Sequence, residues 1–357
     1  MPEGEYASGL AGIWEWFADT SCRGYSPLYD RICRFVARDD ELLELIREAP
    51  PEAHQPNVLL GVAHYLLLAG LDHPLADVYA GRGDADPGPL FHDLCVAHRA
   101  EVLALMQTRR TQTNEVGRSA VIGPALTWVA TRMGTPLALL DVGASAGLNL
   151  ACDRYLLDYG PAGTTGPSDS SVRIECAVRG GNPPIAPELP PIVARVGLDR
   201  SPIDLTDEAD ARWMLACIWP DTGRLDRTRA AIREAQRNPP TIRPGDMVDD
   251  LPRVLAELPD NATACVLNTW SLAYLRREDR ERYAAQLAAA GRTRTIVWIS
   301  GEGPGVVAEL AHAKPPVTED IEPSVLGAIV YDGDTEHATT LAFVHPHGAS
   351  IDWVESG

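Results

Sequence analysis

Apolar residues recur every three to four positions along roughly the first 130 residues, which is the spacing of one face of a helix. Leu10, Trp14 and Phe17 form one such stripe. The same spacing continues over 56–71, and over 90–108 it predicts a single long helix. Residues 1–130 are therefore predicted to form an all-helical cap domain.

From residue 137 onward, short apolar runs alternate with helical patterns, which is typical of βαβ units and a parallel sheet. Strands are predicted at 137–142, 192–198, 240–243, 263–268, 293–300, 325–331 and 338–344. Helices are predicted at 147–157, 207–218, 223–237, 249–257, 278–290 and 304–313. The last two strands flank Asp332-Gly333-Asp334, a turn sequence that favours an antiparallel hairpin. Residues 131–357 are thus predicted to form an α/β domain with a mostly parallel sheet and an insertion at about 160–191.

The first strand of this domain leads into a glycine-rich turn. Asp141 stands at the carboxyl end of the strand, and glycines allow positive φ or a close approach of the backbone to a ligand. Ligands of open α/β sheets bind where strand ends meet the following helices. We therefore place a cofactor here. Its candidate contacts in this stretch are Asp141, Gly143, Ala144, Ser145, Gly147 and Asn149.

The second and third strands end in further acids. Asp199, followed by Arg200, is placed to accept hydrogen bonds from two ribose hydroxyls, and its alternative role is a turn or helix cap. Asp246 and Met247 suit an adenine, because the acid accepts from the amine and the thioether packs on the ring. A simple turn is the alternative for this pair.

The fourth and fifth strand ends suggest a substrate wall. Asn268 is followed by Trp270 and Tyr274, and polar groups beside aromatic rings are typical of small-molecule sites. Glu302, which is flanked by glycines, is expected to be exposed at the same rim, either as a base or as a solvated loop acid. Asn268 is predicted to orient the acceptor during catalysis.

A dense polar cluster precedes the first strand. Gln112, Asn114, Glu115 and Arg118 bring amide, acid and guanidinium groups together, and on a helix Asn114 and Arg118 share a face. These residues are predicted to contact the substrate, with Glu115 as the candidate base. The alternative is a structural network between domains.

The composition argues against binding of nucleic acid, against a zinc site and against a membrane span. A net charge of −19 repels phosphate backbones, so nucleic acid is not expected. Seven scattered cysteines without a C-x-x-C pair indicate reduced thiols in a cytoplasmic protein rather than a zinc site, and two histidines in His345-Pro-His347 do not make a metal site. No apolar run is long enough to span a membrane.

The spacing Asp141-x-Gly143-x-x-x-Gly147 after an apolar strand resembles motif I of class I S-adenosylmethionine-dependent methyltransferases. This resemblance implies a Rossmann-like class I methyltransferase sheet and S-adenosylmethionine as cofactor. Nearly the whole chain also resembles the family known as domain of unknown function 2332. The motifs that support this second resemblance are 112–118, 142–149 with 153–155, 195–199, 213–220 and 345–348.

The expected function is methyl transfer from S-adenosylmethionine to a small-molecule acceptor. The main alternative is a non-catalytic ligand-binding or regulatory protein on the same fold. A third possibility is a hydrolase, because 143–147 also spells Gly-x-Ser-x-Gly, with Ser145 as nucleophile, Glu302 as acid and His345 or His347 as base. The helical pattern before residue 137 counts against it, since such an elbow follows earlier strands of the sheet.

Overall fold

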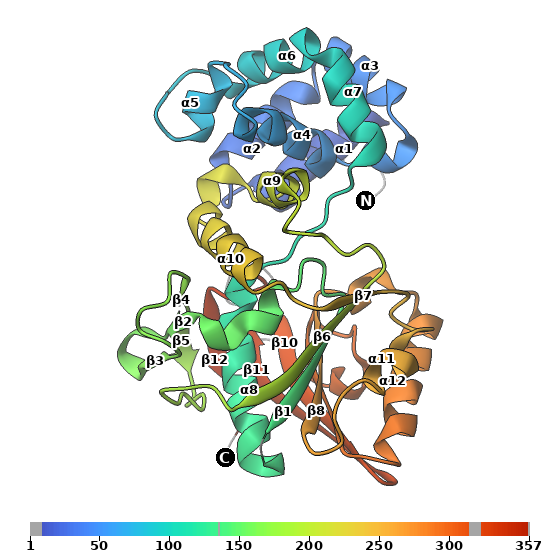
Figure 1. The fold of residues 1–357 in the computed structure, drawn as a ribbon. Coiled ribbons are helices and arrows are strands. Elements are labelled where there is room, and N and C mark those ends of the chain that lie inside the picture. Colours follow the sequence, from blue (N-terminus) through green and yellow to red (C-terminus); the bar gives the residue numbers. More distant parts are fainter. Residues whose placement is uncertain (1–8, 135, 314–322, 356–357) are drawn as a thin grey trace. The chain divides into compact units, whose positions relative to one another are not determined.

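The computed structural model describes residues 9–134, 136–313 and 323–355. The chain divides into two compact units, shown in Figure 1. The first comprises Met1–Thr113 with Thr206–Arg229, and the second comprises Asn114–Leu205 with Ala230–Gly357. The segment 206–229 therefore belongs to the helical unit, although the sequence pattern alone placed it in the α/β domain.

The described part of the first unit is helical, as its periodicity predicts. Its helices are α1 (Leu10–Phe17), α2 (Pro27–Val36), α3 (Asp40–Glu48), α4 (Pro56–Leu68), α5 (Leu75–Tyr79), α6 (Pro87–Ala97), α7 (Arg99–Thr108) and α9 (Glu208–Ala216). The unit boundary falls within α10 (Leu225–Arg237). The predicted single helix over 90–108 is wrong, because His98 leaves helical geometry (φ −111°, ψ 29°) and separates α6 from α7.

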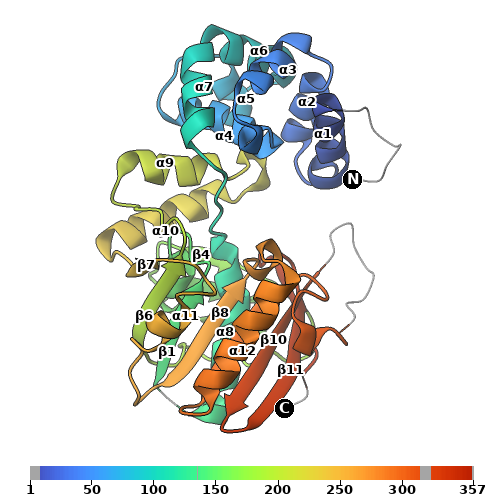
Figure 2. The same cartoon turned by 90° about the vertical axis from the view of Figure 1, so that its right-hand side faces the viewer.

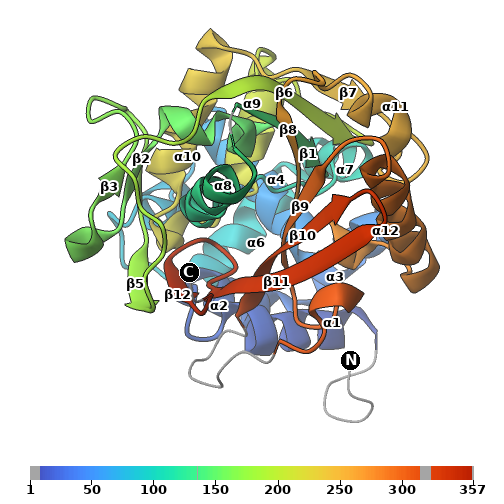
Figure 3. The same ribbon diagram turned by 90° about the horizontal axis from the view of Figure 1, so that it is seen from below.

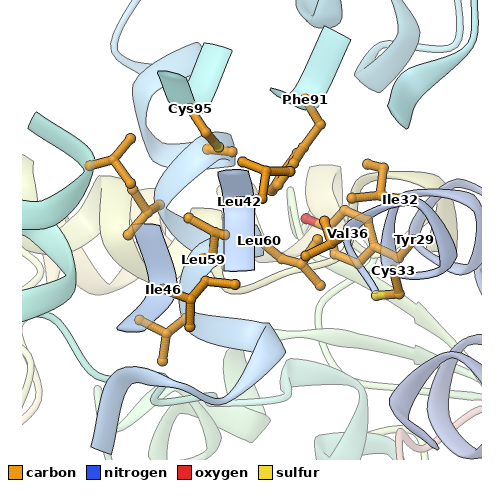
Figure 4. Packing of buried hydrophobic residues seen from close by; sticks show 14 of the residues in the cluster. Tyr29, Ile32, Cys33, Val36, Leu42, Ile46, Leu59, Leu60, Phe91 and Cys95 are labelled. Carbon is orange, nitrogen blue, oxygen red and sulfur yellow. The ribbon is translucent and has the colours of Figure 1, made fainter. Parts of the chain in front are cut away.

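The helices of the first unit share one hydrophobic core, which Figure 4 shows at close range. Leu42 of α3, Leu59 of α4 and Phe91 of α6 are fully buried in it. Trp213 of α9 belongs to the same core, and its ring lies 3.3 Å from where a Cβ on Gly61 of α4 would stand. The helix α9 thus completes a core that the earlier segment begins.

The second unit is built on a nine-stranded sheet in the order β5-β12-β11-β10-β9-β8-β1-β6-β7. The strands are β1 (Leu137–Val142), β5 (Ala177–Gly180), β6 (Ile192–Asp199), β7 (Ile242–Pro244), β8 (Thr263–Thr269), β9 (Ile296–Glu302), β10 (Ser324–Asp332), β11 (Thr335–Val344) and β12 (Ser350–Trp353). The five strands β7, β6, β1, β8 and β9 run parallel, and β10 and β11 form an antiparallel hairpin. A mixed α/β fold with a mostly parallel sheet is therefore confirmed.

The five parallel strands have the spatial order 3-2-1-4-5 when they are numbered along the chain. This is the order of doubly wound sheets, in which the direction of winding reverses between the first and fourth strands. Here the reversal lies between β1 and β8. Ligands of doubly wound sheets generally bind beyond the carboxyl ends of the two strands at the reversal.

Helices cover both faces of this sheet (Figures 2 and 3). α11 (Leu251–Leu255) and α12 (Arg277–Gly291) lie on one face, and α8 (Ser119–Met133) lies on the other. Ala138, Leu140 and Val142 belong to the core under α11 and α12. Because side chains alternate along a strand, Asp141 points to the face that α8 covers.

The segment after the first strand departs from its prediction. A helix over 147–157 is wrong, since a kinked 3-10 turn (Leu148–Arg154) with non-helical Ala151 leads directly into β2 (Leu156–Asp158). β2 forms a small second sheet with β3 (Thr164–Thr165) and β4 (Arg173–Glu175). The predicted helix at 304–313 is also wrong, because only a 3-10 turn (Ala308–Leu310) forms there.

Candidate functional site

The glycine loop, residues 143–147, turns the chain at the carboxyl end of β1. Gly143, Ser145 and Gly147 have φ of 83°, 54° and 71°. A Cβ on Gly143 would stand 2.4 Å from Cβ of Ser271, and one on Gly147 would stand 2.9 Å from Pro240. Both glycines are therefore required by the protein's own packing, and their predicted contact with a cofactor stays a prediction.

Backbone strain is concentrated beside the sheet reversal. Among the described residues, the non-glycine positions with positive φ are Ser145 (54°) and Trp270 (55°). Ser145 follows β1 and Trp270 follows β8, the two strands on either side of the reversal. Such conformations cost about 1–3 kcal/mol and cluster at functional sites. This edge of the sheet is thus the candidate ligand site.

Asp141 is a buried carboxylate at this edge. Its side chain is 3% exposed, and no described residue donates a hydrogen bond to it. Burial, reinforced by the charge of Asp199, raises the pKa of Asp141 to about 7, and the charge of Arg118 opposes the shift. A perturbed, unpartnered acid at a strand end marks a functional-site candidate.

Asp199 fastens the glycine loop to the end of β6. Its Oδ2 accepts the N–H of Ser145 at 2.7 Å, and its Oδ1 accepts the N–H of Ser201 at 2.9 Å. Ala144 packs against β6, because a Cβ on Gly197 would lie 2.8 Å from its methyl group. These bonds match the turn-cap alternative, and the predicted contact of Asp199 with ribose stays a prediction.

The loop after β7 is organised by Asp246. Its Oδ2 pairs with Arg200 at 2.6 Å, and its Oδ1 accepts the N–H groups of Val248 and Asp249. The hydrogen bond from Arg200 lowers the pKa of Asp246. Met247 reaches toward the glycine loop, since its Cε would lie 3.6 Å from a Cβ on Gly143. Met247 therefore approaches the loop directly.

The polar segment 114–118 crosses the same edge. Oδ1 of Asn114 accepts the N–H of Leu148 at 2.7 Å, and Nη1 of Arg118 donates to the carbonyl of Thr269 at 2.8 Å. Only Val116–Arg118 forms a 3-10 turn, so the shared helical face expected for Asn114 and Arg118 does not form. Gln112 lies in the first unit, and its predicted contact with the substrate stays a prediction.

Arg118 occupies a partly buried position among acids. Burial lowers its pKa, and the charges of Glu115, Glu302 and Asp141 oppose this. Arg118 nevertheless forms no ion pair with a described carboxylate, and its Nε donates to the carbonyl of Pro346 at 2.9 Å. Its charge therefore acts on the acids over a distance rather than by direct pairing.

Glu115, which is predicted to be catalytic, is held by other groups of the protein. Glu115 is 2% exposed, its Oε1 accepts the N–H of Gly117 at 2.8 Å, and its Oε2 lies 3.9 Å from Nδ1 of His347. Oδ1 of Asn149, a predicted cofactor contact, likewise accepts the hydroxyl of Ser119 at 2.9 Å. These roles stay predictions.

The side-chain amide of Asn268 makes all the hydrogen bonds that it can make with other groups of the protein. Nδ2 donates to the carbonyl of Val142 and to Oγ of Ser271, each at 3.0 Å. Oδ1 accepts the hydroxyl of Tyr283 at 2.7 Å and Nε1 of Trp298 at 2.9 Å. The side chain is fully buried, so the geometry lends no support to its predicted contact with an acceptor.

Glu302 is buried, and the expectation of an exposed rim acid is wrong. It is 1% exposed, because its Oε1 turns inward and accepts the N–H groups of Ser271 (2.8 Å) and Leu272 (3.0 Å). Its Oε2 has no hydrogen-bond partner among the described residues. Burial raises its pKa. The small hollow beside it, lined by Gly303, Val307 and other residues, has no room for a water molecule.

The aromatic residues after β8 are placed differently from each other. Trp270 is partly buried, and its Nε1 donates to Oγ of Ser324 at 2.7 Å. Tyr274 is 85% exposed. Tyr274 is thus available to a ligand, whereas Trp270 is fixed by its hydrogen bond.

The hydrolase alternative lacks its catalytic contacts. Oγ of Ser145 is buried and makes no hydrogen bond with a described residue. The oxygen Oε1 of Glu302 is bonded to the turn after β8, and His347 neighbours Glu115. A nucleophilic serine needs a base within hydrogen-bond reach. The geometry therefore gives this alternative no support.

The described residues contain neither a cluster of potential metal ligands nor a helix that could cross a membrane. No group of three or more His, Cys, Asp or Glu side chains in them could hold a metal ion. No helix in the same part of the chain is long and apolar enough to cross a bilayer.

Comparison with known proteins identifies one relationship. The model of a family described as "Uncharacterized protein conserved in bacteria (DUF2332)" matches residues 12–353. No curated protein and no solved structure matches the chain.

Proposed function

The chain belongs to the DUF2332 family, and from the geometry of its sheet edge we propose that it binds S-adenosylmethionine and transfers the methyl group to a small-molecule acceptor. The family description names no activity. The proposal therefore depends on the candidate site and on the methyltransferase-like motif at Asp141-x-Gly143.

The unpartnered carboxylate of Asp141 is the observation that carries the proposal. A buried acid without a hydrogen bond or ion pair is costly, and a bound cation relieves that cost. S-adenosylmethionine carries a sulfonium and an ammonium group. Its positive charge would meet Asp141 at the reversal point of the sheet, where ligands of doubly wound folds bind.

The neighbouring loops suit the remaining parts of such a cofactor. The ribose hydroxyls are placed at the carboxylate of Asp199, at the end of β6, which also accepts two N–H groups of the chain. Met247, close to Gly143, supplies a thioether for an adenine ring. Asp246, which precedes Met247 and pairs with Arg200, is proposed to accept from the adenine amine.

When bound, the cofactor supplies an activated methyl group for an in-line displacement. The residues of the chain then position the acceptor and, where the acceptor carries a proton, remove it. Glu115 is proposed as that base, with Asn114, Arg118 and Tyr274 beside it as acceptor contacts. Acidic groups around the site favour an acceptor that is neutral or cationic over an anionic one.

The runner-up is a non-catalytic ligand-binding protein, and one observation favours it. Asn268 has no free hydrogen-bonding group, and Glu115 caps its own turn. A site that binds the cofactor but lacks a free base would sense it rather than use it.

Transfer of label separates these two functions. The full chain is incubated with S-adenosylmethionine labelled in its methyl group and with an ultrafiltered bacterial metabolite extract. Label recovered in a small molecule with the wild type, and much reduced with Asp141→Asn, supports the transferase. Cofactor binding without any transfer of label would favour the binding protein.

A further inference from the structure

Glu302 joins strand ends that are far apart in the sequence. It is the last residue of β9, and its Oε1 accepts two N–H groups of the turn that follows β8. The first of these belongs to Ser271. Oγ of Ser271 donates in turn to the carbonyl of Val142, the last residue of β1, at 2.9 Å. A continuous set of contacts therefore runs from β9 to the start of the glycine loop.

The position of Ser271 is tightly defined. Its Cβ occupies the space where a side chain on Gly143 would stand, at 2.4 Å. Nδ2 of Asn268 also donates to its Oγ at 3.0 Å. A shift of this turn would therefore change the packing against Gly143 and the hydrogen bond to Val142 together.

We infer that Glu302 is a positioning residue for the glycine loop, which it holds in place through Ser271, rather than a group that touches the acceptor. Its buried Oε2 and the tight hollow beside it leave no space for a substrate atom. The inference extends the proposed function, because it names a residue outside the loop that controls cofactor affinity. In this role Glu302 needs only one side-chain oxygen that accepts two N–H groups.

Two variants separate this role from general stability. Glu302→Gln keeps an accepting oxygen at the same length of side chain, whereas Glu302→Met has the length without the acceptor. Ile329→Ala, in the buried middle of β10, serves as the control because it lowers stability and Ile329 makes none of the hydrogen bonds described above for Glu302 and Ser271.

The ligand-free readout is amide hydrogen exchange of the peptide that covers 143–147. Glu302→Met is expected to speed this exchange by about tenfold, Glu302→Gln to restore it nearly to the wild-type rate, and Ile329→Ala to leave it unchanged. Equal acceleration in Ile329→Ala, or none in Glu302→Met, overturns the inference. If Glu302→Met does not fold, Ser271→Ala tests the next contact of the same set, since it removes the hydroxyl that donates to the carbonyl of Val142 and accepts from Nδ2 of Asn268.

The ligand readout is the affinity for S-adenosylhomocysteine. Glu302→Met is expected to weaken it by about tenfold, and Glu302→Gln to recover it. Unchanged affinity in a folded Glu302→Met protein contradicts the inference. Absence of any affinity in the wild type would count against the proposed function alone, and the exchange measurement then decides the role of Glu302.

Discussion

The backbone N–H of Ser145 donates to the carboxylate of Asp199 at 2.7 Å, so the end of β6 holds the glycine loop in its strained conformation. Ser145 has positive φ, which costs free energy that the surrounding bonds must offset. Asp199, which the sequence predicts as an acceptor for ribose hydroxyls, is therefore also a structural support of the glycine loop.

Removal of Asp199 should affect both stability and binding. Hydrogen bonds to a charged group contribute about 1.5–3 kcal/mol each, with the lower end expected here because Asp199 is partly exposed. We predict that Asp199→Ala lowers the free energy of unfolding by about 1–3 kcal/mol and weakens cofactor affinity, while Asp199→Asn loses less of each. Denaturant unfolding and calorimetry measure the two effects. An Asp199→Ala protein with unchanged stability and unchanged amide hydrogen exchange over 143–147 would contradict this supporting role.

Gly143 should tolerate a side chain only if Ser271 makes room. A Cβ there meets Ser271 at 2.4 Å, whereas a Cβ on Gly160, which also has positive φ, meets nothing within 4 Å. Gly160→Ala should therefore cost about 1–2 kcal/mol for backbone strain alone, and Gly143→Ala should cost more. Ser271→Gly should recover part of the difference in the double variant. Equal melting temperatures for the two single variants would rule out the contact with Ser271.

Stability should depend on pH through Asp141. Its pKa rises from an ordinary 3.8 to about 7 in the folded protein, so between these values the folded chain holds a proton that the unfolded chain has lost. The stability from this group is complete below about pH 4 and is lost as the pH rises to about 7. Asp141→Asn does not titrate, so its stability relative to wild type should increase over that window, by at most about 4 kcal/mol.

Urea unfolding of both proteins at about pH 5 and about pH 8 measures this change. Asp334→Asn, which removes an exposed acid in the β10–β11 turn, is the matched control and should show no such trend. A constant difference between Asp141→Asn and wild type across the two pH values would show that Asp141 titrates normally.

Ser145 should not behave as a serine nucleophile. Its Oγ makes no hydrogen bond with a described residue and therefore has no base to activate it. We predict that a fluorophosphonate probe leaves Ser145 unlabelled, as judged by peptide mass spectrometry after a long incubation. Stoichiometric labelling that Ser145→Ala abolishes would restore the hydrolase alternative.

The sheet was largely predictable because its strands are continuous apolar runs. β1 has the predicted bounds, and the predicted runs for β6 and β8 end one residue short of the observed strands. The pattern of α9 was also recognised, but not its location. A helix between two strands has the same apolar spacing whether it covers the sheet or, as with Trp213, completes another core.

The site was less predictable, because side-chain direction depends on contacts distant in sequence. Glu302 between glycines has the local sequence of an exposed loop, and only the turn after β8 draws its carboxylate inward. The amide oxygen of Asn268 likewise has both of its hydrogen bonds from Tyr283 and Trp298, which no local sequence pattern connects to it. Residue type and strand position thus predicted which side chains lie at one edge of the sheet, but not which of their polar groups are already bonded within the protein.

The central claim is that Asp141 receives an organic cation, and calorimetric titration with S-adenosylmethionine at about pH 8 tests it most directly, because the acid is then ionised. We predict that the wild type and the control Asp334→Asn bind S-adenosylmethionine alike. Asp141→Asn should lose about 10- to 100-fold in affinity for it and less for the uncharged thioether S-adenosylhomocysteine. Equal affinity of wild type and a folded Asp141→Asn protein for S-adenosylmethionine, or no binding by either, would contradict the claim.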